Sequence, residues 1–323
     1  MKKTLCELLR DFFPRDLESE DLYWTSIANC VFNSFLIHTA IMLNIVTIHA
    51  IRKTSSIPKT LKTLLLSLAV SDVGVGVLVQ PCYISLLIKH LQLTVPNCNA
   101  YKLFPLVSNS FCSASFLVVL AVSVDRFLAI HLHLRYQELV THKRVVAVVI
   151  SIWLLSASLP FVMFSIPLDI YSLIAGIGGI VVLVITTMVY IRIYLAVRRH
   201  KNQINIQVLQ VRQVAQAREV ATFSNLVKSA VGTFYVYIVL LLCYLPFLFS
   251  LVAKEINSSS IVLKRFSLFA FTLLCLNSSL NPIIYCWKMR HIRHTVMNIL
   301  RTMYWYRSGA SHETPAWAGP TTP

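Results

Sequence analysis

The chain contains 323 residues, of which 56% are hydrophobic and 13% are charged, and its mean hydropathy is +0.68. This composition excludes an ordinary soluble globular protein and is typical of an integral membrane protein. In a soluble chain the net charge of +16 would suggest nucleic-acid binding. In a membrane protein, anionic lipid and partners on the inner face explain it, so we expect membrane lipid as a partner and no nucleic acid.

Seven apolar runs predict an all-α fold, a seven-transmembrane helix bundle. A spanning helix needs about 20 mostly apolar residues. The fourth and fifth runs are almost continuous, and we divide them at Pro167 because a proline close to Asp169 indicates a turn. The runs lie near Trp24–Ile51, Leu61–Ile88, Tyr101–Ile130, Val145–Ile166, Leu168–Val197, Ser229–Ala253 and Phe266–Trp287.

The segments flanking this bundle have different compositions. We divide the chain into an extracellular N-terminal tail (1–23), the seven-helix domain (24–287), an amphipathic membrane-surface helix (288–307) and a disordered cytoplasmic tail (308–323). The amphipathic helix is predicted because apolar residues recur at helical spacing opposite basic ones. The apolar set is Met289, Ile292, Val296, Ile299 or Leu300, and Met303.

The distribution of basic residues predicts the orientation. Twenty of the 29 Lys and Arg residues lie in or beside the first, third and fifth connections between spans and in the C-terminal segment. Short cytoplasmic loops retain such residues, so the N-terminus is predicted outside and the C-terminus inside the plasma membrane. On the outer side we expect Cys6 and Cys98 to be free thiols rather than a bridge, and Asn257 begins a candidate glycosylation sequon.

Asp72 is the one deeply placed ionisable residue of the spans. Ionisable groups are costly in lipid, so each is a candidate functional site. Oxygen donors lie at similar depth, and a carboxylate with neutral oxygens suits a small hard cation. The alternative is a protonated aspartic acid that holds water in a packing network. The oxygen donors are Asn44, Ser115, Asn277, Ser278 and Asn281.

Two prolines interrupt the last two spans. Pro282 cannot donate to the carbonyl of Ser278, so it loosens the seventh span where polar residues and Tyr285 already gather. Pro246 follows Tyr244 in the sixth span. Both helices are therefore predicted to bend, although a polar helix–helix contact would also explain the seventh-span residues.

Asp125 and Arg126 form an acid–base pair at the inner end of the third span. Adjacent charges at such a place can hold one another in a resting geometry, which makes Arg126 a candidate switch. The alternative is an interfacial arginine whose guanidinium reaches the lipid headgroups.

Together these residues resemble the rhodopsin-like (class A) G-protein-coupled receptors from about Trp24 to Leu300. The order and spacing of the motifs across all seven spans carry the resemblance. The matching positions are Asn44, Leu68 to Asp72, Asp125-Arg126-Phe127 with Phe for Tyr, Trp153, Tyr190, Tyr244-Leu245-Pro246 with Tyr for Trp, and Asn281 to Tyr285.

The resemblance implies a receptor that senses an extracellular ligand and activates heterotrimeric G proteins, with arrestin and a receptor kinase as further candidate partners. It implies no cofactor except an allosteric sodium ion, held by Asn44, Asp72, Ser115, Asn277, Ser278 and Asn281. It also implies an activation switch formed by Asp125, Arg126, Tyr190, Tyr244, Pro246, Asn281, Pro282 and Tyr285.

Ligand class is narrowed mainly by exclusion. An amine receptor of this family would place aspartate at Ser108, and an opsin would place lysine at Cys275. A lipid, a small molecule and a short peptide remain open. The expected pocket wall is Ser108, Cys112, Tyr244, Phe247 and Leu251, with Asp169, Lys254 and Lys264 at the rim.

Two departures from the family pattern are informative. The second outer loop has no cysteine and the fifth span has no proline, which resembles the melanocortin, cannabinoid, lysophospholipid and adenosine receptor branch. No acid lies near Leu226 and Lys228 at the inner end of the sixth span. We expect elevated basal signalling, because nothing there would restrain Arg126.

Other classes of protein fit less well. An enzyme would need converging catalytic groups, but Asp72 has no second buried acid, so we expect no enzyme. A transporter would more often show internal repeats and broken helices in matching positions. The alternative we retain is a constitutively active or ligand-independent seven-helix signalling or scaffold protein.

Overall fold

The computed structural model describes residues 20–92, 94, 97–132, 135–208, 214–256 and 260–307, and the regular elements in these ranges are all helical. Seven helical segments are long and apolar enough to cross a membrane, which confirms the predicted seven-helix bundle. Their bounds as spans are Leu22–Lys53, Lys59–Leu91, Cys98–Leu132, His142–Phe164, Ile170–Arg199, Leu226–Ala253 and Ile261–Lys288.

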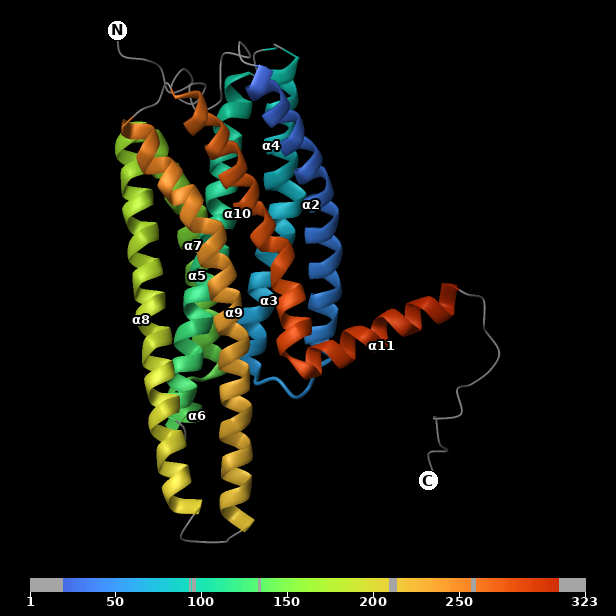
Figure 1. Ribbon diagram of the computed structural model, residues 1–323, viewed down its shortest axis with the longest axis vertical. Helices are drawn as coiled ribbons and strands as arrows, with labels where there is room; N and C mark the ends of the chain where they lie inside the picture. Colours follow the sequence, from blue (N-terminus) through green and yellow to red (C-terminus); the bar gives the residue numbers. More distant parts are fainter. Residues whose placement is uncertain are drawn as a thin grey trace.

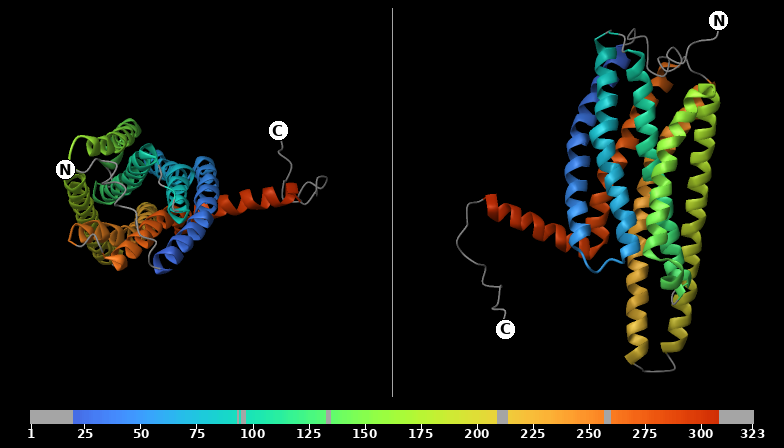
Figure 2. Two further views of the ribbon diagram at one scale, coloured as in Figure 1. Left: turned by 90° about the horizontal axis from the view of Figure 1, so that it is seen from above. Right: turned by 180° about the vertical axis from the view of Figure 1, so that it is seen from behind.

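The helices stand side by side and form a ring when seen along the bundle axis (Figure 1, Figure 2). The fourth span ends in the 3-10 helix η3, and Pro167 separates it from the next helix, where the sequence predicted a turn. The elements are α2 (Glu20–Lys53), α3 (Lys59–Gly74), η1 (Val75–Val79), α4 (Gln80–Leu91), α5 (Cys98–Leu132), α6 (Tyr136–Leu139), α7 (His142–Ser158), η3 (Leu159–Phe164), α8 (Leu168–Val208), α9 (Val214–Ile256), α10 (Ile261–Lys288) and α11 (Arg290–Arg307).

The second span contains a π-helical segment that the sequence did not predict. α3 passes into η1 at Gly74, and α4 continues from η1. Such segments usually occur as single turns and often lie at functional sites. Gly76 lies so close to α2 that a Cβ would come within 2.9 Å of Ile41 Cγ1, so glycine permits the close approach of these helices.

A row of buried polar side chains joins α2 to α10. Asn33 Nδ2 donates to Thr272 Oγ1 at 2.8 Å, and Thr272 Oγ1 donates to Asn29 Oδ1. Gln80 Nε2 of α4 adds a contact of 3.4 Å to Asn33 Oδ1. Farther along, Thr39 Oγ1 lies 3.0 Å from Ser279 Oγ. Lipid offers no alternative hydrogen-bond partners, so these pairs fix the two helices against each other.

The longest helical extensions lie at the end of the bundle where α10 meets α11. α8 and α9 continue beyond the neighbouring helices, and α11 runs sideways from the foot of α10 (Figure 1). The apolar side of α11 is anchored on the bundle, where Ile292 is fully buried. Thr54 Oγ1 at the end of α2 contacts Thr295 Oγ1 at 3.2 Å. α11 thus lies within the segment predicted to be amphipathic.

One expectation about the outer cysteines was wrong. Cys98 is disulfide-bonded rather than a free thiol, whereas the other described cysteines are free. Cysteine spacing did not indicate a bridge, because bridge formation depends on the folded path of the chain. Cys6, the Asn257 sequon and the 308–323 tail lie outside the described residues.

Replacing Asn33 with valine is expected to destabilise the bundle by about 1–2 kcal/mol, because Thr272 and Gln80 each lose a partner in a site without water. Ser34→Ala is the matched control, since the exposed Ser34 hydroxyl bonds only to the carbonyl of Cys30. Thermal unfolding in detergent micelles measures both variants. Equal midpoints for the two would contradict the proposed clamp.

Candidate functional site

One end of the bundle contains a cavity of about 120 Å³ between α4, α5, η3, α8, α9 and α10. Of the predicted pocket residues, Ser108, Phe247 and Leu251 line it, and Lys264 lies at its wall. The side chains of Asp169 and Lys254 are not described. The full lining is Tyr83, Tyr101, Phe104, Pro105, Ser108, Asn109, Met163, Tyr171, Ser172, Ala175, Phe247, Ser250, Leu251, Lys264, Ser267, Leu268 and Phe271.

Aromatic rings form one wall of this cavity. Phe271 of α10 is central, with ring centroids 4.6 Å from Tyr83, 5.3 Å from Phe104 and 5.9 Å from Phe247. Such ring pairs stabilise a fold by more than the burial of their apolar surface alone would. The cluster joins four helices and offers flat apolar surface to a guest, while Lys264 and several hydroxyls supply polar contacts.

Tyr244 and Cys112 do not line the cavity but lie next to its lining residues. Tyr244 Oη donates to the backbone carbonyl of Cys112 at 3.0 Å, and its ring stacks on Phe116 with centroids 5.0 Å apart. Tyr244 therefore links α9 to α5 two residues before Pro246. Phe247 and Leu251, farther along α9, contact the cavity itself.

Asp72 lies at the centre of the bundle and is fully buried. Asn281 Nδ2 donates to Asp72 Oδ2 at 2.8 Å, and Ser115 Oγ lies 3.5 Å from Oδ1. Ser278 lies close to the same carboxyl group. Ser115 also donates to Ser71 Oγ at 2.8 Å. Three helices, α3, α5 and α10, therefore converge on one carboxyl group.

Asn44 supports this cluster indirectly. Its Nδ2 donates at 2.8 Å to the carbonyl of Ser278, the same carbonyl that Pro282 leaves without a backbone donor. It also donates to the carbonyl of Ala40 at 2.8 Å. The sequence predicted Asn44 as a member of the sodium pocket with Asp72, but in the structure its amide nitrogen donates to the Ser278 carbonyl at the proline gap in α10.

The donor set around Asp72 fits a small hard cation. The side-chain carbonyl oxygens of Asn44, Asn277 and Asn281 are buried, and none accepts a hydrogen bond from the part of the chain that is described. Buried acceptors of this kind usually have a partner, either protein or bound solvent and ions. A carboxylate with amide and hydroxyl oxygens is the set that alkali and alkaline-earth cations prefer. Within the described part of the chain no hydrogen bond joins Asn277 to Asp72, and Asn277 offers its orphaned oxygen.

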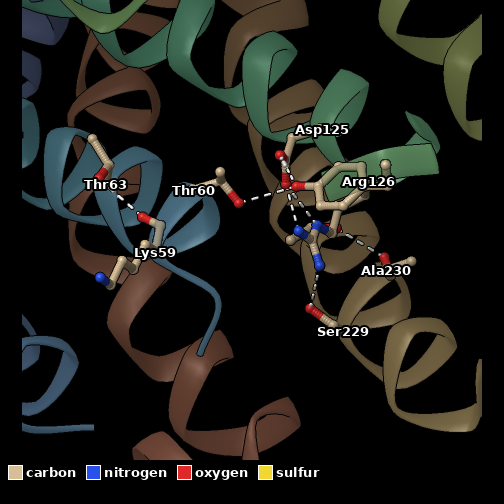
Figure 3. Close-up of polar contacts among 9 residues, drawn as sticks. Lys59, Thr60, Thr63, Asp125, Arg126, Ser229 and Ala230 are labelled. Carbon is tan, nitrogen blue, oxygen red and sulfur yellow. Dashed lines mark hydrogen bonds and ion pairs between the residues drawn. The ribbon is translucent and has the colours of Figure 1, made fainter. Parts of the chain in front are cut away.

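At the other end, Arg126 is buried among polar partners from α5 and α9. Its Nε donates to Asp125 Oδ2 at 3.0 Å, and its Nη2 contacts the same oxygen. Nη1 reaches Ser229 Oγ of α9 at 3.4 Å (Figure 3). Arg126 is 1% exposed, so it is not an interfacial arginine that extends to headgroups. Ser229 lies in the stretch near Leu226 and Lys228 where the sequence has no acid. Its neutral hydroxyl restrains Arg126 more weakly than a carboxylate would.

Tyr136 completes this arrangement from the short helix α6. Its hydroxyl donates to Asp125 Oδ1 at 2.6 Å and lies 3.0 Å from Thr60 Oγ1. Burial raises the pKa of Tyr136 to about 12, and the negative Asp125 acts in the same direction. The hydroxyl thus remains a neutral donor at physiological pH, and the Asp125 carboxylate is hydrogen-bonded on both oxygens.

Tyr190 and Tyr285 lie between the two polar centres. Both hydroxyls are buried and unsatisfied within the described ranges. Neighbouring hydroxyls of Ser123 and Thr233 donate instead to backbone carbonyls, at 2.7 and 3.0 Å. Apolar side chains lie around Tyr285: Leu65, Leu68, Val119, Val122 and Val236.

Sequence reasoning missed the residues that complete the Arg126 contacts. Ser229, Tyr136 and Thr60 carry no motif, and their contacts depend on helix rotation and on α6, an element too short to predict. A signal did exist for the α2 row: Asn29 and Asn33 are four residues apart, and Asn44 follows eleven later, so all three share one helical face.

Comparisons with known proteins agree with this geometry. The sequence matches the family model of the 7 transmembrane receptor (rhodopsin family) over residues 43–168 and 166–285. It is 26% identical to adenosine receptor A2a of Canis lupus familiaris over 298 residues, covering 81% of this chain and 69% of that receptor. It is 24% identical to adenosine receptor A3 of Ovis aries over 312 residues, covering 88% of this chain and 93% of that one. The chain therefore belongs to the rhodopsin family of seven-transmembrane receptors, which sense an extracellular ligand and signal through heterotrimeric G proteins.

Proposed function

We propose that the ligand binds in the aromatic cavity and that the G protein docks at the Arg126 end of the bundle. One observation carries this assignment: the single helix α9 lines the cavity with Phe247 and Leu251 and contacts Arg126 with Ser229. A ligand that displaces the cavity part of α9 thereby acts on the restraint of Arg126. The charge distribution of the loops supports the orientation, with the cavity outside and Arg126 at the cytoplasmic face of the plasma membrane.

Tyr244 and Pro246 couple the two ends. Pro246 removes one backbone hydrogen bond from α9, so the helix bends most easily there. Tyr244 holds this bend to α5 through the Cys112 carbonyl. Ligand contact with Phe247 shifts this geometry and draws Ser229 away from Arg126. Tyr190 and Tyr285, whose hydroxyls lack partners, then supply new hydrogen bonds to the released guanidinium and its surroundings.

Asn281 and Pro282 allow the end of α10 to move as the end of α9 does. Asn281 ties α10 to Asp72 of α3, and Pro282 allows the following turn with Tyr285 to move. The stationary part of α10 remains fastened to α2 through Asn44 and the polar row. Movement is thereby confined to the inner ends of α9 and α10.

We also propose an allosteric sodium ion at Asp72. Asp72, Ser115, Ser278 and Asn281 would hold it, with the orphaned oxygens of Asn44 and Asn277 as further acceptors at its margin. When bound, the ion would supply positive charge that offsets the buried carboxylate. Because it would draw α3, α5 and α10 together, it favours the resting arrangement.

The small size of the cavity favours a small-molecule ligand over a peptide. Drug-sized ligands occupy cavities of roughly 300–1,000 Å³, whereas this one measures about 120 Å³. The aromatic wall suits a flat ring, and the relatives named adenosine receptors make adenosine the first compound to test. We propose that the protein itself performs no covalent chemistry. We also propose arrestin and a receptor kinase as further partners of the face where the G protein docks.

Purified receptor in nanodiscs, with a panel of heterotrimeric G proteins and a small-molecule library that includes adenosine, tests the main proposal. An active compound is expected to accelerate nucleotide exchange, and Ser108→Phe is expected to abolish the response by filling the cavity. Ser110→Phe, on the same helix but outside the cavity lining, is the control. Exchange that no compound alters would favour a ligand-independent signalling protein.

Removing the Asp72 charge tests the sodium site. The wild-type unfolding midpoint is expected to be higher in sodium chloride than in N-methylglucamine chloride of equal ionic strength, because the ion binds only the folded state. Asp72→Asn is expected to erase this difference, since a neutral amide cannot offset the ion's charge. A difference that survives in Asp72→Asn would place the sodium effect elsewhere.

Tyr136→Phe is expected to raise ligand-independent nucleotide exchange. Loss of the hydrogen bond to Asp125 weakens the resting arrangement by about 1–1.5 kcal/mol, a change of up to roughly tenfold. Because the raised pKa keeps Tyr136 protonated, the effect should be constant from about pH 6 to about pH 9, and the bond fails only as the pH approaches the Tyr136 pKa of about 12. Tyr194→Phe, which is 65% exposed on α8, is the control. An unchanged basal rate in Tyr136→Phe would remove Tyr136 from the switch.

A further inference from the structure

A second cavity lies on the lipid-facing surface of the bundle, between α5 and α7 and near the Arg126 end. It has a volume of about 610 Å³ and is open along one side. Neither the ligand cavity nor the Asp72 cluster shares a lining residue with it. The lining is Leu64, Leu117, Leu120, Ala121, Val124, Asp125, Leu128, Leu139, Val140, Arg144, Val145, Ala147, Val148, Ser151, Ile152 and Leu155.

The walls of this groove are suited to hydrocarbon. Small side chains of Ala121, Ala147 and Ser151 leave the space, and branched apolar side chains surround it. Val148 is 47% exposed and Leu155 is 48% exposed. Both lie on α7, a membrane-spanning helix, so what they meet is an acyl chain rather than water.

The length of the groove matches one leaflet. Arg144 and Leu155 lie eleven residues apart on the spanning segment, a rise of about 16 Å. One leaflet contributes about 15 Å of hydrocarbon, half of the roughly 30 Å membrane core. A single acyl chain that begins at Arg144 therefore ends near Leu155, at the middle of the bilayer.

Arg144 lies at the mouth of the groove. The exposed Arg144 gives one hydrogen bond, from Nη1 to the carbonyl of Leu139 at 2.6 Å, and a guanidinium has five N–H donors. Arg135 lies near it in the chain, and Glu138 is the acid of this stretch. A contact of 3.5 Å between Thr63 Oγ1 and His142 Nδ1 brings the start of α3 alongside.

We propose that this groove binds one acyl chain of an anionic phospholipid, whose phosphate sits on Arg144. The bound lipid also reaches the switch, because Asp125 lines the groove and Leu139 and Val140 follow Tyr136 along α6. A chain packed there holds α6 against α5 and preserves the bond from Tyr136 to Asp125. The lipid thus stabilises the resting state from outside the bundle. The site rests on the proposed orientation only for the identity of the leaflet.

Photo-crosslinking in nanodiscs tests the site without any ligand or G protein, so its outcome is independent of the receptor assays. The probe is phosphatidylglycerol with a diazirine on its acyl chain, in a phosphatidylcholine background. Labelled peptides are expected to concentrate in residues 117–128 and 144–155. Arg144→Gln is expected to reduce that labelling about fivefold, and Ala147→Phe to reduce it by filling the groove.

Lys143→Gln is the matched control, because Lys143 is exposed beside Arg144 but does not line the groove. It should leave labelling within the error of the wild type. Both Arg144 and Ala147 are exposed, so their substitution does not disturb the buried core. Labelling spread evenly over all lipid-facing helices, equal effects of Arg144→Gln and Lys143→Gln, or insensitivity to Ala147→Phe would each overturn the proposal.

Discussion

The absence of water around the bundle is the constraint on which this structure depends. Inside lipid, a backbone carbonyl that loses its helical donor must find another donor in the protein. Pro282 creates such a carbonyl at Ser278, and Asn44 of α2 supplies the missing hydrogen bond at 2.8 Å. The proline can thus loosen α10 without leaving an unsatisfied group, and the same contact fixes α10 to α2. Flexibility and attachment arise at one residue.

The same constraint divides the bundle into a firm part and a movable part. α2, α10 and the start of α4 share side-chain hydrogen bonds through Asn29, Asn33 and Thr272. Within the described residues, the Ser229 end of α9 is held to Arg126 by a neutral contact of 3.4 Å. Breaking that contact has a low cost, so changes at the cavity can alter it. Asp72 lies between the two parts, where a cation would favour the closed arrangement.

Much of this could be predicted from the sequence, because polar residues in apolar spans are few and must meet one another. Asp72, Ser115 and Asn281 were grouped by depth alone, and the structure brings them together. Asn44 was grouped with them but points to Ser278, since depth does not specify helix rotation. Ser229 and Tyr136 were missed because serine and tyrosine are ordinary residues at a membrane boundary. The π-helical turn at Val75–Val79 and the bond at Cys98 depend on tertiary contacts that periodicity does not encode.

The continuity of α9 has a mechanical consequence. The helix runs for 43 residues without a break in its assignment, and Pro246 lies 17 positions from Ser229, which corresponds to about 26 Å along the axis. With the proline as a fulcrum, a tilt of about 5° would swing Ser229 by about 2 Å, enough to separate it from Arg126. A small displacement of α9 beside the cavity thereby becomes a larger displacement of Ser229 at the opposite face of the membrane.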